Sequence, residues 1–161
     1  RCGYFGHPTR PCTCKAGDVA RYLSHISGPM LDRMDIQIEL PSLSFDEIST
    51  QDPHAEASAV IRQRVIQARA FAKARMEADG AVPRCNAQLD PAGIHRYCTA
   101  TKDAMALLRD AYDRLSLSAR GHDRLLRVAR TIADLDESEI IGEEHIAQAV
   151  QLRSLDRKYW H

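Results

Sequence analysis

The sequence predicts a mainly α-helical protein, in which a helical bundle is preceded by one helix and one strand. Residues 55–78 are rich in alanine, arginine and glutamine and contain no proline or glycine, which favours one long helix. Residues 101–115 and 117–135 carry apolar residues at the i, i+3, i+4 spacing of amphipathic helices. Strict alternation of apolar and polar residues, which is typical of a strand, occurs at residues 35–40.

The first 40 residues are predicted to contain one helix and the strand. Residues 16–26 form the helix, with apolar positions at Val19, Tyr22, Leu23 and Ile26. The sequence Ser-Gly-Pro at 27–29 is a strong helix stop. A short turn over residues 30–33 then leads into the half-buried strand 35–40, which Pro41 closes.

Residues 41–54 are predicted to be a linker, because serine, threonine, aspartate and proline dominate them, with at most one helical turn around 46–48. The long helix that follows carries two stripes. Its apolar stripe consists of Ile61, Val65, Ala68 and Ala72, and its basic face of Arg62, Arg69 and Lys73. Such a basic face could contact a phosphate backbone, although a solvated helix surface is the commoner meaning of the pattern.

After a break at residues 80–91, the chain is predicted to form four more helical segments. Ile94, Tyr97 and Cys98 indicate a short helix, and Thr101 and Ser118 are suited to cap the next two. The residues expected to face the core are Ala104, Leu107, Leu108, Ala111 and Leu115 in the first of these, and Leu125, Val128, Ala129, Ile132 and Leu135 in the second. Residues 140–150 are expected to form a short extended entry and a last helix. We expect His122 and His145 to lie on polar faces and to have no chemical role.

Composition restricts the classes of function. The chain of 161 residues has 22 basic and 22 acidic side chains, so its net charge does not indicate a nucleic-acid-binding protein. No apolar run approaches the roughly 20 residues of a membrane span. Five cysteines without an export signal argue against a disulfide framework and for a reducing compartment. We therefore expect a soluble, cytoplasmic protein without membrane contacts.

Three of the cysteines, Cys2, Cys12 and Cys14, lie in a segment rich in glycine and proline. Three thiols are one ligand short of a closed tetrahedral zinc site. The fourth ligand could be His7 or, equally well, a cysteine outside the given sequence. The alternative is that they are ordinary reduced thiols in an irregular terminus. Cys85 and Cys98 lie in other contexts and are expected to be boundary or core residues.

Several motifs resemble the magnesium chelatase and MCM branch of the AAA+ ATPases, and most closely its magnesium chelatase-related, ComM/YifB-type bacterial group. They are the cysteine loop, Gly-Pro-Met-Leu-Asp-Arg-Met-Asp at 28–35, Arg-Cys-Asn-Ala-Gln-Leu at 84–89, Leu-Ser-Ala-Arg at 117–120 and Arg-Ser-Leu-Asp-Arg at 153–157. The chain begins without methionine and contains no Gly-x-x-x-x-Gly-Lys-Ser/Thr loop, so we expect a C-terminal fragment that is inactive alone.

The resemblance implies a helical AAA+ lid bundle preceded by the last helix and strand of the α/β ATPase core. It divides the chain into the core end with its cysteine loop (1–40), a linker (41–54) and the lid domain (55–161). It further implies that Arg33 is an arginine finger acting in trans and that Arg120 is the sensor 2 arginine, which contacts an ATP phosphate in cis. The resemblance also implies that the full-length protein binds ATP and magnesium and forms a homo-hexamer. It implies a cysteine loop that holds zinc, and an action on DNA such as branch migration in natural transformation.

Other interpretations remain open. Arg33 could simply pair with Asp32 or Asp35, and the arginines of residues 117–135 could form surface ion pairs. If Arg120 is not the sensor, Arg124 and Arg127 are the next candidates. The chain could also be a non-enzymatic helical module that binds DNA or protein, or part of the ATPase subunit of a true magnesium chelatase.

Overall fold

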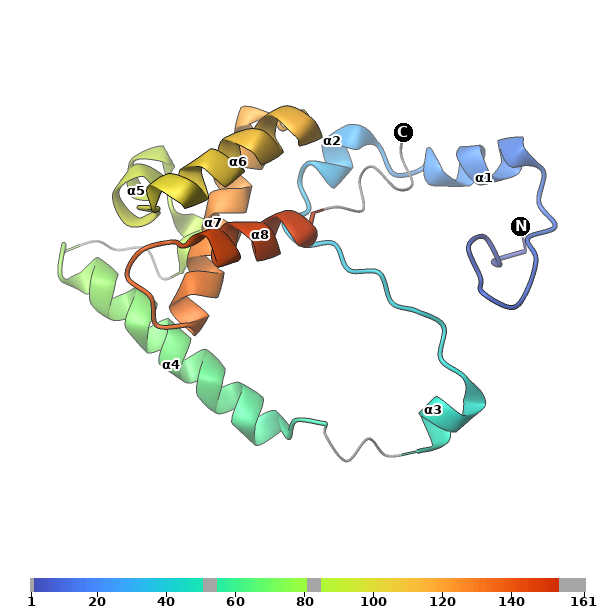
Figure 1. Cartoon of the computed structure of the whole chain (residues 1–161), viewed down its shortest axis with the longest axis horizontal. Coiled ribbons are helices and arrows are strands. Elements are labelled where there is room, and N and C mark those ends of the chain that lie inside the picture. The colour runs from blue at the N-terminus through green and yellow to red at the C-terminus, as the bar shows by residue number, and fades with distance from the viewer. Residues whose placement is uncertain (1, 51–54, 81–84, 154–161) are drawn as a thin grey trace. The chain divides into compact units, whose positions relative to one another are not determined.

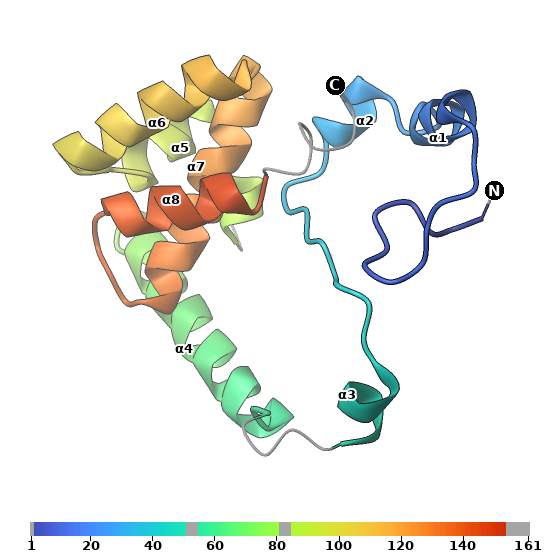
Figure 2. The same cartoon turned by 45° about the vertical axis from the view of Figure 1, so that its right-hand side comes forward.

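The computed structural model describes residues 2–50, 55–80 and 85–153 of the chain. It divides into two compact units, one formed by the described residues up to Ala55 and the other by Glu56–Arg153 (Figures 1 and 2). The described residues form eight α-helices and one 3-10 helix, so the predicted mainly α class is confirmed. None of these helices is both long enough and apolar enough to cross a membrane.

The first unit contains three short helices, α1 (Ala16–Leu23), α2 (Gly28–Leu31) and α3 (Phe45–Ser49). Helix α1 ends at Leu23, three residues before the predicted end, and residue 30, expected in a turn, lies in α2. Helix α3 is the single helical turn expected in the linker. A capping box starts it, because Ser44 Oγ accepts from the Glu47 amide at 3.3 Å and the Glu47 carboxylate accepts from the Ser44 amide at 2.7 Å.

The strand predicted over residues 35–40 is not formed, which corrects that expectation. The segment is extended without a ladder partner, and Ile36, Ile38 and Leu40 are 52 %, 66 % and 84 % exposed. Within the described part of the chain, the β-type pairing is limited to one parallel bridge between Ala100 and Ile141. A strand forms only beside a second strand, and the described residues place none beside residues 35–40.

The second unit begins with α4 (Ser58–Glu77), the long predicted helix. Only its C-terminal half packs, and Ala68 and Met76 are buried there. Ile61 and Val65, which belong to the predicted apolar stripe, are 41 % and 38 % exposed. The apolar stripe therefore continues beyond the part of the helix that the bundle covers.

The rest of the bundle consists of η1 (Asn86–Gln88), α5 (Pro91–Tyr97), α6 (Lys102–Leu115), α7 (Ala119–Leu135) and α8 (Glu143–Gln151). Side-chain caps fix three of these starts. Asp90 caps α5, and the predicted caps Thr101 and Ser118 are confirmed for α6 and α7.

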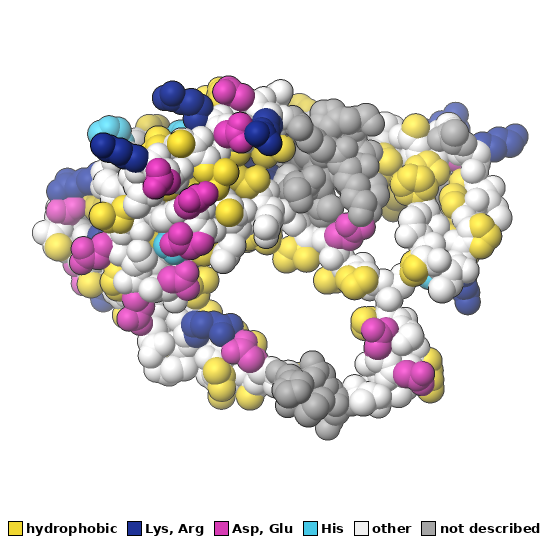
Figure 3. Space-filling view, in the orientation of Figure 1, with side chains coloured by type: hydrophobic (Ala, Val, Ile, Leu, Met, Phe, Trp, Pro, Cys, Tyr) yellow, Lys and Arg dark blue, Asp and Glu magenta, His cyan; other side chains and the backbone are white. Residues whose placement is uncertain are grey.

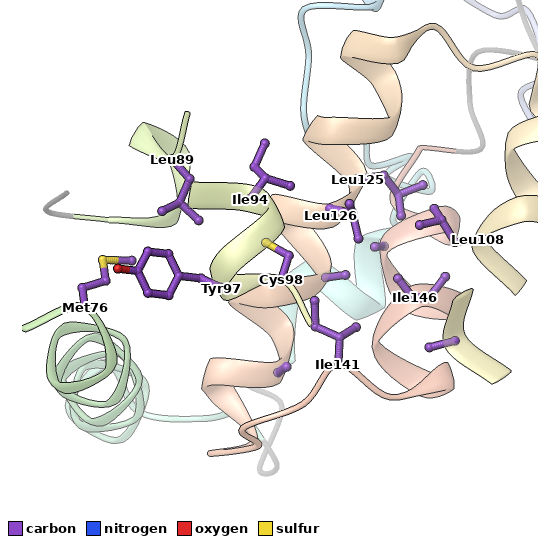
Figure 4. Packing of buried hydrophobic residues seen from close by; sticks show 14 residues of the cluster. Met76, Leu89, Ile94, Tyr97, Cys98, Leu108, Leu125, Leu126, Ile141 and Ile146 are labelled. Atoms are coloured by element: carbon purple, nitrogen blue, oxygen red, sulfur yellow. The ribbon is translucent and has the colours of Figure 1, made fainter. Parts of the chain in front are cut away.

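Helix α7 lies against α4, α5, α8 and η1. It contributes more residues to the buried apolar core than any other helix, namely Leu125, Leu126, Ala129 and Ala133. The largest core side chains, shown in Figure 4, are Met76, Leu89, Ile94, Tyr97, Cys98, Leu108, Leu125, Leu126, Ile141 and Ile146. The predicted core position of Cys98 is confirmed, and burial raises the pKa of its thiol to about 11. Leu135, predicted to point inward, is 39 % exposed at the end of α7.

Candidate functional site

Arg33 lies just after α2, where the Gly-Pro pair at residues 28 and 29 starts a helix of a single turn. Its Nη1 donates to the Pro29 carbonyl at 3.1 Å, and the side chain is exposed. That bond ties a terminal nitrogen of the guanidinium group to the start of α2.

Arg120 lies in the first turn of α7 and is exposed. The Ser118 cap fixes this turn, since Ser118 Oγ accepts from the Gly121 amide at 3.0 Å. Arg120 therefore projects from the N-terminal end of a rigid helix, where backbone amides also attract a phosphate. Arg33 and Arg120 belong to different units.

The other arginines of α7 differ from Arg120. Arg124 and Arg127 are half-buried, and Arg127 Nη2 donates to the Leu89 carbonyl at 2.7 Å. Arg130 is 0 % exposed, so the interpretation that the arginines of residues 117–135 form surface ion pairs is wrong for this residue. Arg120 is thus the sensor candidate whose guanidinium is most accessible.

The three N-terminal cysteines are brought together. Cys2 Sγ lies 3.5 Å from Cys12 Sγ and 3.4 Å from Cys14 Sγ, and all three sulfur atoms lie within 4.8 Å of one another. Backbone amides of Tyr4 and Thr13, followed by the neighbouring thiols, lower the pKa of Cys2 to about 6 against the opposing effect of burial. Sulfur ligands of this kind are suited to soft metal ions.

His7, one of the two candidates for a fourth ligand, is not part of this cluster. Its Nδ1 accepts from the amides of Thr9 and Arg10, both at 3.2 Å. The ring edge stacks against Tyr4, with 5.6 Å between the ring centroids. His7 therefore stabilises the turn between the cysteines.

Sequence reasoning missed a buried polar cluster between α4, η1 and α7. Asp134, 2 % exposed, accepts from Arg75 at 2.5 Å, from Arg130 Nε at 3.1 Å and from Asn86 Nδ2 at 2.7 Å. Arg130 also donates to the carbonyls of Glu139 at 2.9 Å and of Ser138. Burial lowers the pKa of Arg130, while Asp134 favours its charged form. The four-residue spacing of Arg130 and Asp134 was the available signal.

His145 is buried, 2 % exposed, instead of lying on a polar face. Its Nδ1 accepts from the Gly142 amide at 2.8 Å, and Nε2 lies 3.2 Å from an Asp136 carboxylate oxygen. It thus joins the start of α8 to the turn after α7. His122 is half-buried and packs edge-on against Tyr112.

The basic face of α4 is exposed at each of its three residues, Arg62, Arg69 and Lys73. Lys73 lies 3.4 Å from Glu77, as in a solvated helix surface. Both acidic and basic side chains appear on the face of the helical unit drawn in Figure 3. Arg84 and residues 154–157 of the motifs quoted above lie outside the described residues.

Comparison with known proteins gives two adjoining family matches. Residues 55–153 match the family described as magnesium chelatase, subunit ChlI C-terminal, and residues 1–48 match the family described as magnesium chelatase, subunit ChlI. The first of these matches coincides closely with the helical unit Glu56–Arg153.

Two bacterial relatives illustrate the similarity. YifB of Escherichia coli is 37 % identical over 148 residues, which is 92 % of this chain and 28 % of YifB. The competence protein ComM of Haemophilus influenzae is 36 % identical over 139 residues, which is 86 % of this chain and 26 % of ComM. The chain thus spans between a quarter and a third of the length of these relatives. These matches show that the chain belongs to the magnesium chelatase subunit ChlI family and is a relative of YifB and ComM.

Proposed function

We propose that this chain is the lid and arginine-finger portion of an AAA+ ATPase, with Arg33 acting in trans and Arg120 acting in cis. The observation that carries the proposal is the placement of the two arginines. Both arginines are exposed. Arg33 donates to the Pro29 carbonyl in α2, and Arg120 lies in the first turn of α7, which Ser118 caps. Family membership adds the expectation of a nucleotide.

The chemistry assigned to both residues is stabilisation of phosphate charge. A guanidinium group keeps its charge at all physiological pH values and donates several hydrogen bonds to phosphate oxygens. An arginine supplied in trans is typically worth 10³–10⁵-fold in the rate of phosphoryl transfer. The sequence contains no Gly-x-x-x-x-Gly-Lys-Ser/Thr loop, so ATP and magnesium would be held by another part of the complete protein.

The proposed motor is a cytoplasmic homo-hexamer that acts on DNA, as in branch migration during transformation. The name of its relative, competence protein ComM, supports this role. An arginine finger in trans needs a neighbouring subunit, which is why the proposal includes an oligomer.

The decisive experiment measures ATP turnover of the complete protein, with and without branched DNA, for wild type, Arg33→Ala and Arg120→Ala. We expect each variant to lose at least 100-fold in DNA-stimulated turnover while keeping its helical circular dichroism. Arg114→Ala is the matched control, since Arg114 is an exposed arginine that pairs with Asp110. Normal turnover of Arg33→Ala or Arg120→Ala would contradict the assignment of that residue.

Action in trans has its own test. Arg33→Ala subunits are mixed with subunits that retain Arg33 but cannot bind ATP. Partial recovery of turnover in the mixture is expected, because the second subunit supplies the missing guanidinium to the first subunit's ATP. If the turnover of the mixture is only the sum of the turnovers of its two inactive components, Arg33 does not act across the interface.

A second candidate function rests on the exposed basic face of α4. Under this alternative the chain is a non-enzymatic DNA-binding module, and Arg62, Arg69 and Lys73 contact phosphates. Its affinity for DNA would then fall steeply with salt, and Arg69→Ala would reduce the slope by about one. Unchanged ATP turnover in Arg33→Ala together with this salt dependence would favour the module. The family description also allows a chelatase subunit, which a magnesium-insertion assay with a porphyrin would detect.

A further inference from the structure

The C-terminal end of α7 is joined to α4 by a bidentate ion pair. Arg75 of α4 donates from Nη1 to Asp134 Oδ1 at 2.5 Å and from Nη2 to Asp134 Oδ2 at 3.1 Å. The side chain of Asp134 is 2 % exposed and that of Arg75 is 18 % exposed. Two parallel hydrogen bonds between planar groups fix the orientation of the groups as well as their distance. The Arg75–Asp134 pair therefore constrains the angle at which α7 lies on α4.

Asn86 of η1 adds to this contact. Its Nδ2 group donates to Asp134 Oδ2 at 2.7 Å and to Thr131 Oγ1 at 3.1 Å, and its Oδ1 atom accepts from Arg75 Nη2 at 3.3 Å. Asn86 is 6 % exposed. Hydrogen bonds that are shielded from water in this way are costly to break. Helices α4 and α7 thus meet at one buried carboxylate, and η1 holds them there.

Arg75 is not needed to neutralise the Asp134 carboxylate. Arg130 donates to Asp134 Oδ1 from within α7 at 3.1 Å and to the Glu139 carbonyl at 2.9 Å. Burial lowers the pKa of Arg130, Asp134 opposes that shift, and the charge of Arg75 adds to it. The cluster thus holds two positive charges and one negative charge. Because the two guanidinium groups repel each other, the contribution of Arg75 is the connection between the helices and not the balance of charge.

Helix α7 links this cluster to Arg120. Arg120 lies in the first turn of α7 and Asp134 in the last turn, so a rise of about 1.5 Å per residue places them roughly 21 Å apart along the helix axis. Over that length, a tilt of about 3° at the Asp134 end moves the Arg120 end by about 1 Å. A displacement of this size is enough to weaken a contact that depends on exact geometry.

We propose that Arg75 is a positioning residue for Arg120. It holds Asp134, fixes the tilt of α7 on α4, and so places the Arg120 guanidinium group against the terminal phosphate of ATP. Arg75 acts without touching the nucleotide. The inference rests on the sensor assignment of Arg120 proposed above. Because ADP lacks the terminal phosphate, loss of Arg75 should weaken the binding of ATP more than the binding of ADP.

The test measures the dissociation constants of ADP and of adenylyl imidodiphosphate, an ATP analogue that is not hydrolysed, for the complete protein. Their ratio is the preference for the terminal phosphate. Arg120→Ala should reduce this preference about 10-fold, the effect of one hydrogen bond to a charged group. Arg75→Met should reduce it about 5-fold. Arg96→Met is the matched control, since Arg96 pairs with Asp79 just after α4, and it should leave the preference unchanged.

A double variant distinguishes positioning from a general loss of stability. If Arg75 acts through Arg120, Arg75→Met should have no further effect on the preference in the Arg120→Ala background. If Arg75→Met has the same effect in both backgrounds, or no effect in either, this inference is overturned while the sensor assignment of Arg120 stands. A wild-type preference in Arg120→Ala would overturn both.

Arg75→Lys serves as the second variant in case Arg75→Met does not fold, which helical circular dichroism would show. Lysine keeps the positive charge but cannot form the paired hydrogen bonds of a guanidinium group. We expect a folded Arg75→Lys protein to have a reduced preference as well. A wild-type preference would overturn the inference, because the charge alone would then be sufficient.

Discussion

Asp134 is the residue on which the buried polar contacts of the bundle converge. It accepts hydrogen bonds from Arg75, Arg130 and Asn86, and Arg130 has no exposed surface of its own. Removal of the carboxylate would leave the Arg130 charge buried without its partner, which typically costs 3–5 kcal/mol. We expect Asp134→Ala to lower the free energy of unfolding by about 3–5 kcal/mol, measured by urea denaturation and circular dichroism.

The control for this prediction is Asp110→Ala, which removes a carboxylate that pairs with Arg114 at the same four-residue spacing. That pair is exposed, with side-chain exposures of 50 % and 74 %, so a loss of about 0.5 kcal/mol or less is expected. Equal losses in the two variants would show that the Asp134 cluster contributes no more than a surface ion pair.

For single residues, the sequence could indicate which polar side chains lie near one another, but it could not indicate which of them are buried. Arg130 and Asp134 lie on the same helix as Arg120. The pair consists of the same residue types as an exposed ion pair, so the sequence does not distinguish the two. The cluster also depends on Arg75 of α4, which donates to Asp134 from 59 residues away and which neighbouring residues cannot reveal. Arg130 itself donates to a carbonyl of the turn after α7. Cys98 was predicted correctly, because a cysteine within an apolar patch is usually a core residue.

At the scale of elements, the start of α7 depends on Ser118. Its Oγ accepts from the Gly121 amide, one of the amides that a helix leaves without an internal partner. Ser118→Ala should therefore destabilise the helical unit by about 1 kcal/mol in urea denaturation. Ser44→Ala, which removes the cap of the short α3 in the other unit, should leave that transition unchanged. A smaller effect of Ser118→Ala than of Ser44→Ala would contradict the importance of the α7 cap.

Helices were predicted more reliably than the strand because their signals are local. The caps Thr101 and Ser118 and the stripe of α6 are read from neighbouring residues, and the structure confirms them. The alternation at residues 35–40 indicates a strand only if a sheet edge is present, and the described residues contain none. The exposed part of the apolar stripe of α4 has the same explanation. Ile61 and Val65 have the spacing of a helix face, but they lie beyond the part of α4 that the bundle covers.

At the scale of the whole molecule, the two units differ in how much apolar surface they bury to stabilise their fold. The helical unit has a continuous core in which α7 contacts four other elements. Among the residues of 2–50 whose side chains are described, Leu31 is the one buried residue. A segment of this length that buries so little apolar surface cannot offset its conformational entropy.

This difference predicts how the units unfold when they are separated. Residues 55–153 expressed alone should melt cooperatively, with a midpoint within about 5 °C of the transition of the full chain, because few of its stabilising contacts are lost. Residues 2–50 alone, without metal, should show no cooperative transition in circular dichroism. A cooperative melt of residues 2–50 alone would contradict this prediction, because it would show that this unit has a core of its own.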